Sequence, residues 1–177
     1  KETGGSGSGV LENSEMPHIA FLSIGSNIGY SVKNCQKAIE SITGHREIEV
    51  IKVSSFYSTE PWGDVEQEWF TNCVVKIKTS LPAFQLLRHL QQIERNLGRE
   101  EFAKGLPRVI DIDILFFDNA VIGEAILTIP HPHLHKRAFV LVPLMETDPL
   151  LIHPVIKKNI GELNQELEDR KKVIRIE

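Results

Sequence analysis

Apolar and polar residues along the chain follow two kinds of spacing, and together they predict an ordered series of strands and helices. β-branched and aromatic residues, in continuous or alternating runs, predict four strands at residues 18–24, 47–57, 70–79 and 107–117. Apolar residues three or four positions apart predict two helices between these strands. Their apolar faces are Val32, Cys35, Ala38/Ile39 and Ile42 in the first helix and Leu86, Leu90, Ile93 and Leu97 in the second.

Helix boundaries follow from residues that favour caps and chain breaks. Ser31 is expected to cap the first helix and Gly44 to close it. Ser80 and Pro82 open the second helix, which Gly98 ends. The remaining elements expected are short strands at 121–122 and 125–129, a helix from 136 up to Pro143, a weak helix at 160–167 and a last strand at 173–176.

The main elements follow the order strand, helix, strand, strand, helix, strand. This is the order of the ferredoxin-like split βαβ arrangement. We therefore predict an α+β fold with a ferredoxin-like βαββαβ core, a mainly antiparallel sheet, helices on both faces and C-terminal additions. Such a fold hosts many activities, so the function has to be inferred from particular residues.

Length and composition narrow the class of protein. The 177 residues suit one domain, and the net charge of −4 disfavours a non-specific nucleic-acid surface. No apolar run approaches the ~20 residues that span a bilayer, and no secretory signal pattern is present. Cys35 and Cys73 lack metal or redox spacing, as is typical of reduced thiols in a cytoplasmic protein. Residues 1–15 are rich in Gly and Ser, which predicts a flexible tail, either an expression remnant or a tether, before one domain at 16–177.

Asp111-Ile112-Asp113 is the most informative motif in the chain. It lies in an apolar predicted strand, where residues two apart share a face, roughly 7 Å apart at the backbone. Burying two like charges together costs several kcal/mol unless a cation offsets them. Carboxylates on a rigid strand suit Mg²⁺, which leaves room for substrate phosphates. The alternative is a strand end whose acids cap backbone groups or pair with Arg108.

Cationic residues lie on both sides of the acid pair in the sequence. Arg and Lys donors stabilise the charge on a transferring phosphoryl group, so this cluster suits a polyphosphate. The alternative is a solvated basic loop. Walker-type, dinucleotide-binding, nucleophile-elbow and H-E-x-x-H motifs are absent, which argues against those classes. The cationic residues are Arg99, Lys104, Arg108, Lys136 and Arg137.

Three histidines and three aromatic residues are further candidates. The histidines alternate, but two intervening prolines and the lack of a fourth ligand favour a hydrogen-bonding or structural role over zinc. The aromatic residues would stack on a flat heterocycle whose edge Asn72 reads. Ordinary core packing is the alternative, and it is weakest for the tryptophan, which lies in a Pro/Gly turn. The six residues are His131, His133, His135, Trp62, Phe70 and Phe139.

Further segments complete an ordered set that runs from residue 18 to about residue 154. They are GSNIG at 25–29, VSSFYSTEPWG at 53–63, Gln67 with Phe70-Thr71-Asn72, Ile93-Glu94, Leu97-Gly98-Arg99, Pro107-Arg108 to Asp113, IPHP at 129–132 and RAFVLVPL at 137–144. In this order they resemble the 6-hydroxymethyl-7,8-dihydropterin pyrophosphokinase family of folate biosynthesis. Each motif is weak alone, whereas the ordered set is highly specific.

The resemblance implies a reaction and a set of contacts. The pterin hydroxymethyl oxygen would attack the β-phosphorus of ATP in line, and AMP would leave. Asp111 and Asp113 would hold two Mg²⁺ ions and act with Arg99 and Arg108 as catalytic residues. ATP contacts would fall on Gln91, Glu94, Arg108, Ile114, Thr128, His131 and Arg137. Pterin contacts would fall on Thr59, Glu60, Trp62, Phe70, Asn72 and Phe139. The expected partners are these two substrates, with no nucleic acid and no membrane, in a monomer that is alone, fused to or associated with another folate enzyme.

The sequence departs from the family pattern in the loop before the acid pair. Members usually carry basic residues and an Arg-Trp-Gly run just before Pro-Arg, whereas residues 100–106 read EEFAKGL and are one residue shorter than a common form. Phe102 would have to replace the aromatic lid, and the two acids would weaken polyphosphate binding. Two hypotheses compete with the enzyme: a catalytically weak pterin- or nucleotide-binding protein with this fold, and a ferredoxin-like interaction module. The intact acid pair, with Arg99, Arg108 and His131, argues against both.

Overall fold

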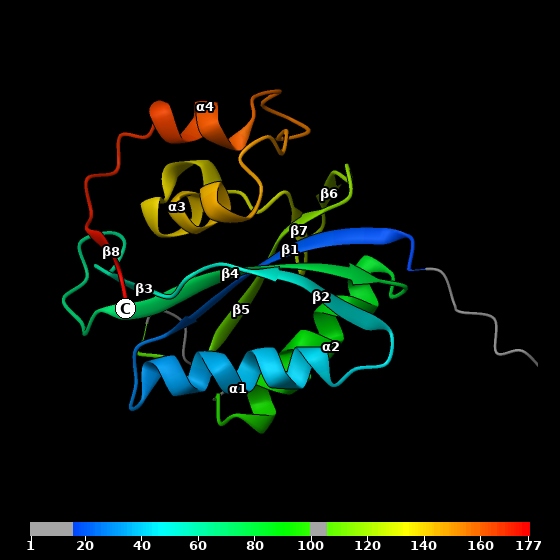
Figure 1. The fold of residues 1–177 in the computed structure, drawn as a ribbon, viewed down its shortest axis with the longest axis horizontal. Coiled ribbons are helices and arrows are strands. Elements are labelled where there is room, and N and C mark those ends of the chain that lie inside the picture. The colour runs from blue at the N-terminus through cyan, green and yellow to red at the C-terminus, as the bar shows by residue number, and fades with distance from the viewer. Residues whose placement is uncertain (1–15, 100–105) are drawn as a thin grey trace, which may run out of the picture.

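The computed structural model describes residues 16–99 and 106–177 (Figure 1). The predicted tail at 1–15 and Phe102 lie outside the described residues. In the part that is described, the main sheet has six strands in the order β5-β1-β4-β3-β8, and β2 also pairs with β4. Every pair in it is antiparallel, which confirms the predicted sheet. The strands are β1 His18–Ser26, β2 Ile48–Val53, β3 Tyr57–Thr59, β4 Phe70–Thr79, β5 Asp111–Phe117 and β8 Val173–Arg175.

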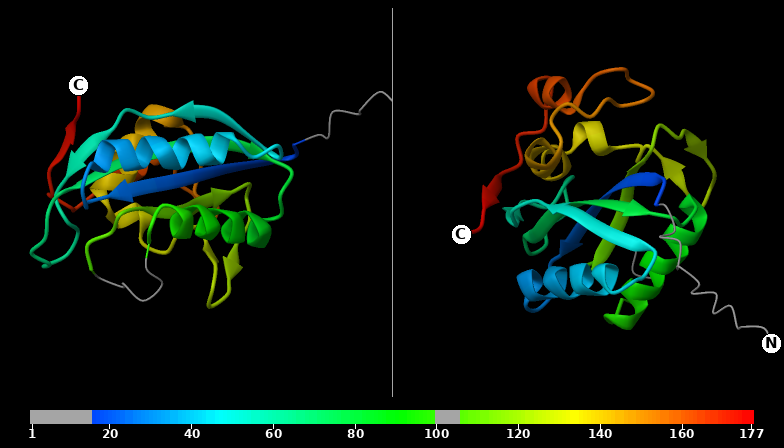
Figure 2. Two further views of the ribbon diagram at one scale, coloured as in Figure 1. Left: turned by 90° about the horizontal axis from the view of Figure 1, so that it is seen from below. Right: turned by 45° about the vertical axis from the view of Figure 1, so that its right-hand side comes forward.

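The helices form two layers, one on each face of the sheet (Figure 1 and Figure 2). α1 and α2 cover one face, and α3 and α4 lie on the other. None of the described helices is both long and apolar enough to pass through a bilayer. The remaining bounds are α1 Ser31–Thr43, α2 Ala83–Asn96, β6 Ile122–Gly123, β7 Thr128–Ile129, the 3-10 helix η1 Leu134–Lys136, α3 Ala138–Thr147 and α4 Ile160–Gln165.

Strand β5 contributes to a separate apolar core on each face of the sheet. Ile112 and Ile114 are buried in the core that α1 and α2 cover. Leu115 is buried in the second core, beneath α3. Because neighbouring residues of a strand point to opposite faces, Asp111 and Asp113 share the face of Leu115. The acid pair is therefore on the side of the sheet that carries α3.

The predicted strand at 47–57 is in fact two strands, β2 and β3. At the break one backbone hydrogen bond remains, from the Ser54 N–H to the Val74 carbonyl at 2.9 Å, and side-chain hydrogen bonds supply the others. Ser54 Oγ accepts a hydrogen bond from the Val74 backbone N–H at 2.9 Å. The backbone N–H and the hydroxyl of Ser55 both donate to Glu146 Oε1, at 2.9 and 2.8 Å.

Two predicted serine caps were wrong, because tertiary contacts take the hydroxyls. Tyr30 stands at the N-cap of α1, and the Ser31 hydroxyl is 2.7 Å from Thr71 Oγ1. Pro82 stands at the N-cap of α2, and Ser80 Oγ donates to Glu47 Oε1 at 3.1 Å.

The predicted end of the third helix at Pro143 was also wrong. Helix α3 continues through Pro143 to Thr147. A proline inside a helix removes one backbone donor and crowds the carbonyl four residues before it, which favours a kink or a helix end. Val140, Leu141 and Leu144 are buried in the second core, and this packing holds the helix together on both sides of the proline.

Candidate active site

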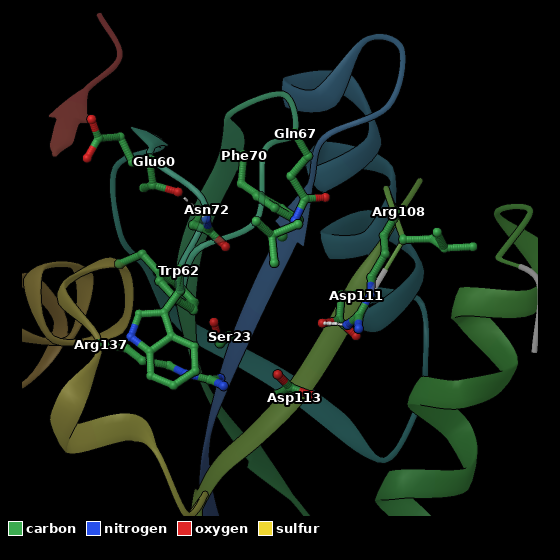
Figure 3. Close-up of a pocket in the computed structure, with 15 residues that line it drawn as sticks. Ser23, Glu60, Trp62, Gln67, Phe70, Asn72, Arg108, Asp111, Asp113 and Arg137 are labelled. Carbon is green, nitrogen blue, oxygen red and sulfur yellow. Dashed lines mark hydrogen bonds and ion pairs between the residues drawn. The ribbon is translucent and has the colours of Figure 1, made fainter. Parts of the chain in front are cut away.

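A pocket of about 280 Å³ opens on the α3 side of the sheet, and the acid pair forms part of its wall (Figure 3). All six predicted pterin contacts and four of the predicted ATP or metal residues line it. The lining residues are Ser23, Gly25, Thr59, Glu60, Trp62, Val65, Gln67, Phe70, Asn72, Leu106, Arg108, Asp111, Asp113, Arg137 and Phe139. The fold thus gathers into one hollow residues from Ser23 to Phe139, which lie 116 positions apart along the chain.

Both carboxylate oxygens of Asp111 are held by arginine. Arg99 Nη1 donates to Oδ1 at 2.8 Å, and Arg108 Nη1 donates to Oδ2 at 2.6 Å. Arg99 also donates to Glu94, a buried residue of α2 whose other oxygen accepts the Ile112 N–H at 2.7 Å. Desolvation raises the pKa of Glu94 against the opposing effect of the Ile112 hydrogen bond and of Arg99. The alternative read from the sequence, a pairing with Arg108, is thus present at Asp111.

Two local structures aim these arginines at the acid. Gly98 has φ +98°, a left-handed conformation that ends α2 and that other residues rarely adopt. The Arg99 N–H then donates to the Glu94 carbonyl at 3.0 Å. On the other side, Asn27 Oδ1 accepts the Arg108 N–H at 2.7 Å, and the Asn27 N–H donates to the Arg108 carbonyl at 3.0 Å.

Asp113 has a different environment from Asp111. Its side chain opens into the pocket, and among the described residues it forms one ion-pair contact, with His131 Nε2 at 3.8 Å from Asp113 Oδ2. Desolvation, followed by repulsion from Asp111 and Glu94, raises the pKa of Asp113. Desolvation and the positive charge of Arg137 lower the pKa of His131 to about 4, so this imidazole is neutral at pH 7. Within residues 16–99 and 106–177, no arginine or lysine forms an ion pair with Asp113, so this carboxylate is available to receive a cation.

This arrangement fits Mg²⁺. Within residues 16–99 and 106–177, no group of three or more His, Cys, Asp or Glu side chains is arranged as a metal site. A complete protein cage is not needed, because Mg²⁺ is usually held by one or two carboxylates together with substrate phosphates. Asp111 and Asp113 supply two such carboxylates on one face of a rigid strand.

Arg137 lines the pocket together with Arg108, and it stacks on aromatic rings. Its guanidinium carbon lies 4.5 Å from the centre of the Trp62 ring and 5.6 Å from that of Phe139. Desolvation lowers the pKa of Arg137, while Asp113 and Asp111 oppose this effect. Nε of Arg137 is buried, and no described residue accepts a hydrogen bond from it. A partly desolvated cation with an unused donor favours an anionic ligand.

The opposite wall combines aromatic rings with a fixed amide. Asn72 Nδ2 donates to Thr59 Oγ1 at 2.6 Å, so the amide oxygen Oδ1 points away from Thr59 and lies next to Gly25. Gly25 pairs with Asn72 in the β1–β4 register, and a Cβ at Gly25 would stand 2.6 Å from Asn72 Oδ1. The absence of a side chain at Gly25 is therefore what lets Asn72 occupy this place beside Phe70 (Figure 3).

Sequence reasoning did not assign a role to Gly25 or Asn27. Both belong to the motif GSNIG at 25–29, which served only as one of the segments that carry the family resemblance. A glycine at the end of a buried strand was the available signal, because it marks a close approach of another group. Nothing local indicated that Asn27 would position Arg108.

Several predicted ATP residues do not line this pocket. Ile114 belongs to the core on the other face of the sheet, Gln91 is exposed on α2 and Thr128 is exposed on β7. Their assignment to ATP stays a prediction. Glu60 lines the pocket, but its carboxylate turns toward the C-terminal strand, where Oε2 accepts the Lys172 N–H at 2.9 Å (Figure 3).

Comparisons with known proteins identify related sequences. Residues 21–149 match the model of the family described as 7,8-dihydro-6-hydroxymethylpterin-pyrophosphokinase (HPPK). A 2-amino-4-hydroxy-6-hydroxymethyldihydropteridine pyrophosphokinase of Aquifex aeolicus is 42% identical over 146 residues, which is 82% of this chain and 90% of that protein.

Longer proteins contain a similar region. The folic acid synthesis protein fol1 of Pneumocystis carinii is 39% identical over 158 residues, which is 89% of this chain but 21% of that protein. Among solved structures, wild-type Plasmodium falciparum HPPK-DHPS with pteroate matches with a TM-score of 0.69 at 18% identity, over 84% of this chain and 42% of that one. At this identity the structural match supports the fold alone.

Proposed function

The chain belongs to the 7,8-dihydro-6-hydroxymethylpterin-pyrophosphokinase family and is a pyrophosphokinase of folate biosynthesis, and on this premise we propose how its pocket carries out the reaction. The hydroxymethyl oxygen of 6-hydroxymethyl-7,8-dihydropterin attacks the β-phosphorus of ATP. The bond from that phosphorus to the oxygen of the α-phosphate breaks, AMP leaves, and the hydroxyl proton is lost to solvent. The product is the pterin diphosphate.

One observation supports this placement above the others. The acid pair, Arg108 and Arg137 line the same pocket as the aromatic rings, and Arg99 binds Asp111 from outside this lining. A polyphosphate and a flat ring would therefore fit side by side. The pterin would lie between Phe70 and Phe139, with its polar edge on Asn72. Thr59 supports Asn72, and the backbone at Glu60 and the ring of Trp62 close the rim.

Asp111 and Asp113 would hold two Mg²⁺ ions. When bound, these ions neutralise the triphosphate and align the attacked phosphorus with the entering oxygen. Arg99, Arg108 and Arg137 would bind the phosphate oxygens on which charge accumulates. The residues contribute mainly position and charge, since a phosphoryl-type transfer asks little covalent chemistry of a protein.

The remaining assignments follow from the same proposal. Gln91, Glu94, Ile114, Thr128 and His131 contact ATP or support its contacts. The chain acts as a cytoplasmic monomer, and the fol1 relative supports a fused arrangement as well. A catalytically weak binding protein is the second candidate, because residues 100–106 depart from the usual lid sequence.

An assay of AMP formation tests the proposal. AMP should appear only when ATP, the hydroxymethyl-dihydropterin and Mg²⁺ are all present, and Asp113→Ala should abolish it. Glu124→Ala, which removes an exposed acid away from the pocket, should leave the rate unchanged. ADP as the product would contradict the proposal. Binding of both substrates without AMP would instead support the binding protein.

A further inference from the structure

Residues 169–175, which we name the C-terminal strap, connect two segments of the pocket wall that are far apart in the sequence. One is the segment from Thr59 to Trp62, and the other is the start of α3 at Arg137 to Phe139. The strap begins at Asp169, which contacts the start of α3, and it continues as β8, which pairs with β3 beside the segment from Thr59 to Trp62. It lies beyond residues 21–149, the part that matches the family model.

The first attachment is a helix cap supplied from a distance. Arg137 stands at the N-cap of α3 and makes no side-chain cap hydrogen bond. Asp169 Oδ2 accepts the Ala138 N–H at 2.9 Å instead, and Asp169 Oδ1 accepts the Lys171 N–H at 3.0 Å. A carboxylate at a helix N-terminus satisfies an unpaired donor and interacts favourably with the helix dipole. The contact fixes Ala138, whose two neighbours are Arg137 and Phe139.

The second attachment uses Glu60 and strand β8. The Glu60 N–H donates to the Lys172 carbonyl at 3.0 Å, and Glu60 Oε2 accepts the Lys172 N–H at 2.9 Å. Directly afterwards, Val173 pairs with Thr59 in the antiparallel ladder between β8 and β3. Thr59 in turn accepts the hydrogen bond of Asn72. The strap therefore supports both the rim and the amide of the aromatic hollow.

We propose that Asp169 and Glu60 are positioning residues, which act through the C-terminal strap to hold the two walls of the pterin pocket at the correct separation. This inference rests on the proposed placement of the pterin. Neither carboxylate needs to touch the substrate: each holds a strap residue or helix end that lies next to a pocket residue. The acid pair on β5 has no attachment to the strap among the described contacts, so the strap influences pterin binding more than it influences the chemical step.

Steady-state kinetics of Asp169→Ala test this. We expect the KM for the pterin to rise about five-fold, the effect of losing one helix cap, while kcat at saturating pterin stays within about two-fold. Asp169→Asn keeps one acceptor oxygen and should recover part of the affinity. Glu168→Ala is the matched control, because it removes the neighbouring exposed acid. Thermal unfolding of each variant shows whether it is folded.

Glu60 provides an independent variant on the opposite wall. Glu60→Ala should raise the pterin KM, and Glu60→Gln, which retains an oxygen that can accept the Lys172 N–H, should restore it. If both alanine variants lower the unfolding temperature without changing the pterin KM, the residues are merely structural and the inference is overturned. If the wild type forms no AMP at all, the proposed function fails instead, so the two failures are distinguishable.

Discussion

The region around Asp111 and the region around Asp113 lie two residues apart on one face of one strand, but they are built differently. Asp111 has an arginine on each carboxylate oxygen, whereas Asp113 faces the hollow and, in the part of the chain that the structure describes, is paired only with a neutral imidazole 3.8 Å away. The first region is a completed ion-pair network that also joins α2 to β5 through Glu94. The second is incomplete within the protein. The difference teaches that identical residues in one motif can have different environments: Asp111 also holds the site together through its arginines, whereas Asp113 faces the pocket.

Asp113→Asn is expected to give the largest loss of activity. It should also separate activity from stability most clearly, because only the activity should fall. The rate of AMP formation should fall by about 10³-fold, because a ligand for Mg²⁺ and its charge are lost. The free energy of unfolding at pH 8 should not fall, because the change removes repulsion from Asp111 and Glu94. Chemical denaturation beside the AMP assay measures both. A clear loss of stability would show that Asp113 is structurally paired after all.

Asp111→Asn tests the structural role given to the other acid of the pair. The variant leaves Arg99 and Arg108 with one neutral acceptor in place of a carboxylate, so we expect a loss of about 1–3 kcal/mol in the free energy of unfolding as well as a loss of activity. Denaturation at low and high salt measures the electrostatic part. A variant that is inactive but as stable as the wild type would contradict the structural role given to Asp111.

Gly25→Ala probes the strand next to the acid pair, since Gly25 is opposite Asp111 in β5 and Asn72 in β4. The added Cβ would lie 2.6 Å from Asn72 Oδ1, so the amide has to move and the pterin KM should rise about ten-fold. Gly123→Ala is the control, because nothing lies within 4 Å of a Cβ there. An equal KM in both variants would remove Asn72 from the proposed pterin edge.

Glu146 extends the comparison to a fully partnered carboxylate away from the pocket. Burial opposes its ionisation, but hydrogen bonds from Tyr57 and Ser55 outweigh burial and lower its pKa. A lowered pKa in the folded state stabilises the protein above the ordinary pKa of Glu, and this contribution is lost as the pH falls through the lowered value. The stability difference between the wild type and Glu146→Gln should therefore be about 1 kcal/mol or less at pH 7 and shrink below pH 4. A difference that grows with acid in pH-dependent denaturation would reverse the sign of this argument.

Local signals were sufficient for much of the fold. Strand β4 begins at Phe70 and ends at Thr79, as the apolar pattern predicts, because the polar residues 66–68 precede the run and Ser80 and Pro82 follow it. The expected caps failed because the hydroxyls of Ser31 and Ser80 find partners on other elements. A short pattern cannot reveal a competing partner that is forty residues away.

The candidate site was predictable in its composition and less so in its connections. The motifs identified Asp111, Asp113 and three arginines. Two of these arginines, Arg108 and Arg137, line one pocket with the acids, and the third, Arg99, binds Asp111. The sequence did not show that two arginines would bind Asp111 and not Asp113. Their placement depends on the local structure at Asn27 and Gly98, which the spacing of the residues does not reveal. The cap from Asp169 to Ala138 spans 31 residues and has no sequence pattern of its own.

The arginine pair on Asp111 has a consequence for how tightly a nucleotide binds. A polyphosphate that recruits Arg99 and Arg108 must first displace a carboxylate already bound to both. Asp111 is thus an internal competitor, present at a high effective concentration because the strand carries it. The measured affinity for a nucleotide will be lower than the number of cationic groups suggests, and a leaving anion will be expelled more readily when Asp111 recovers its partners.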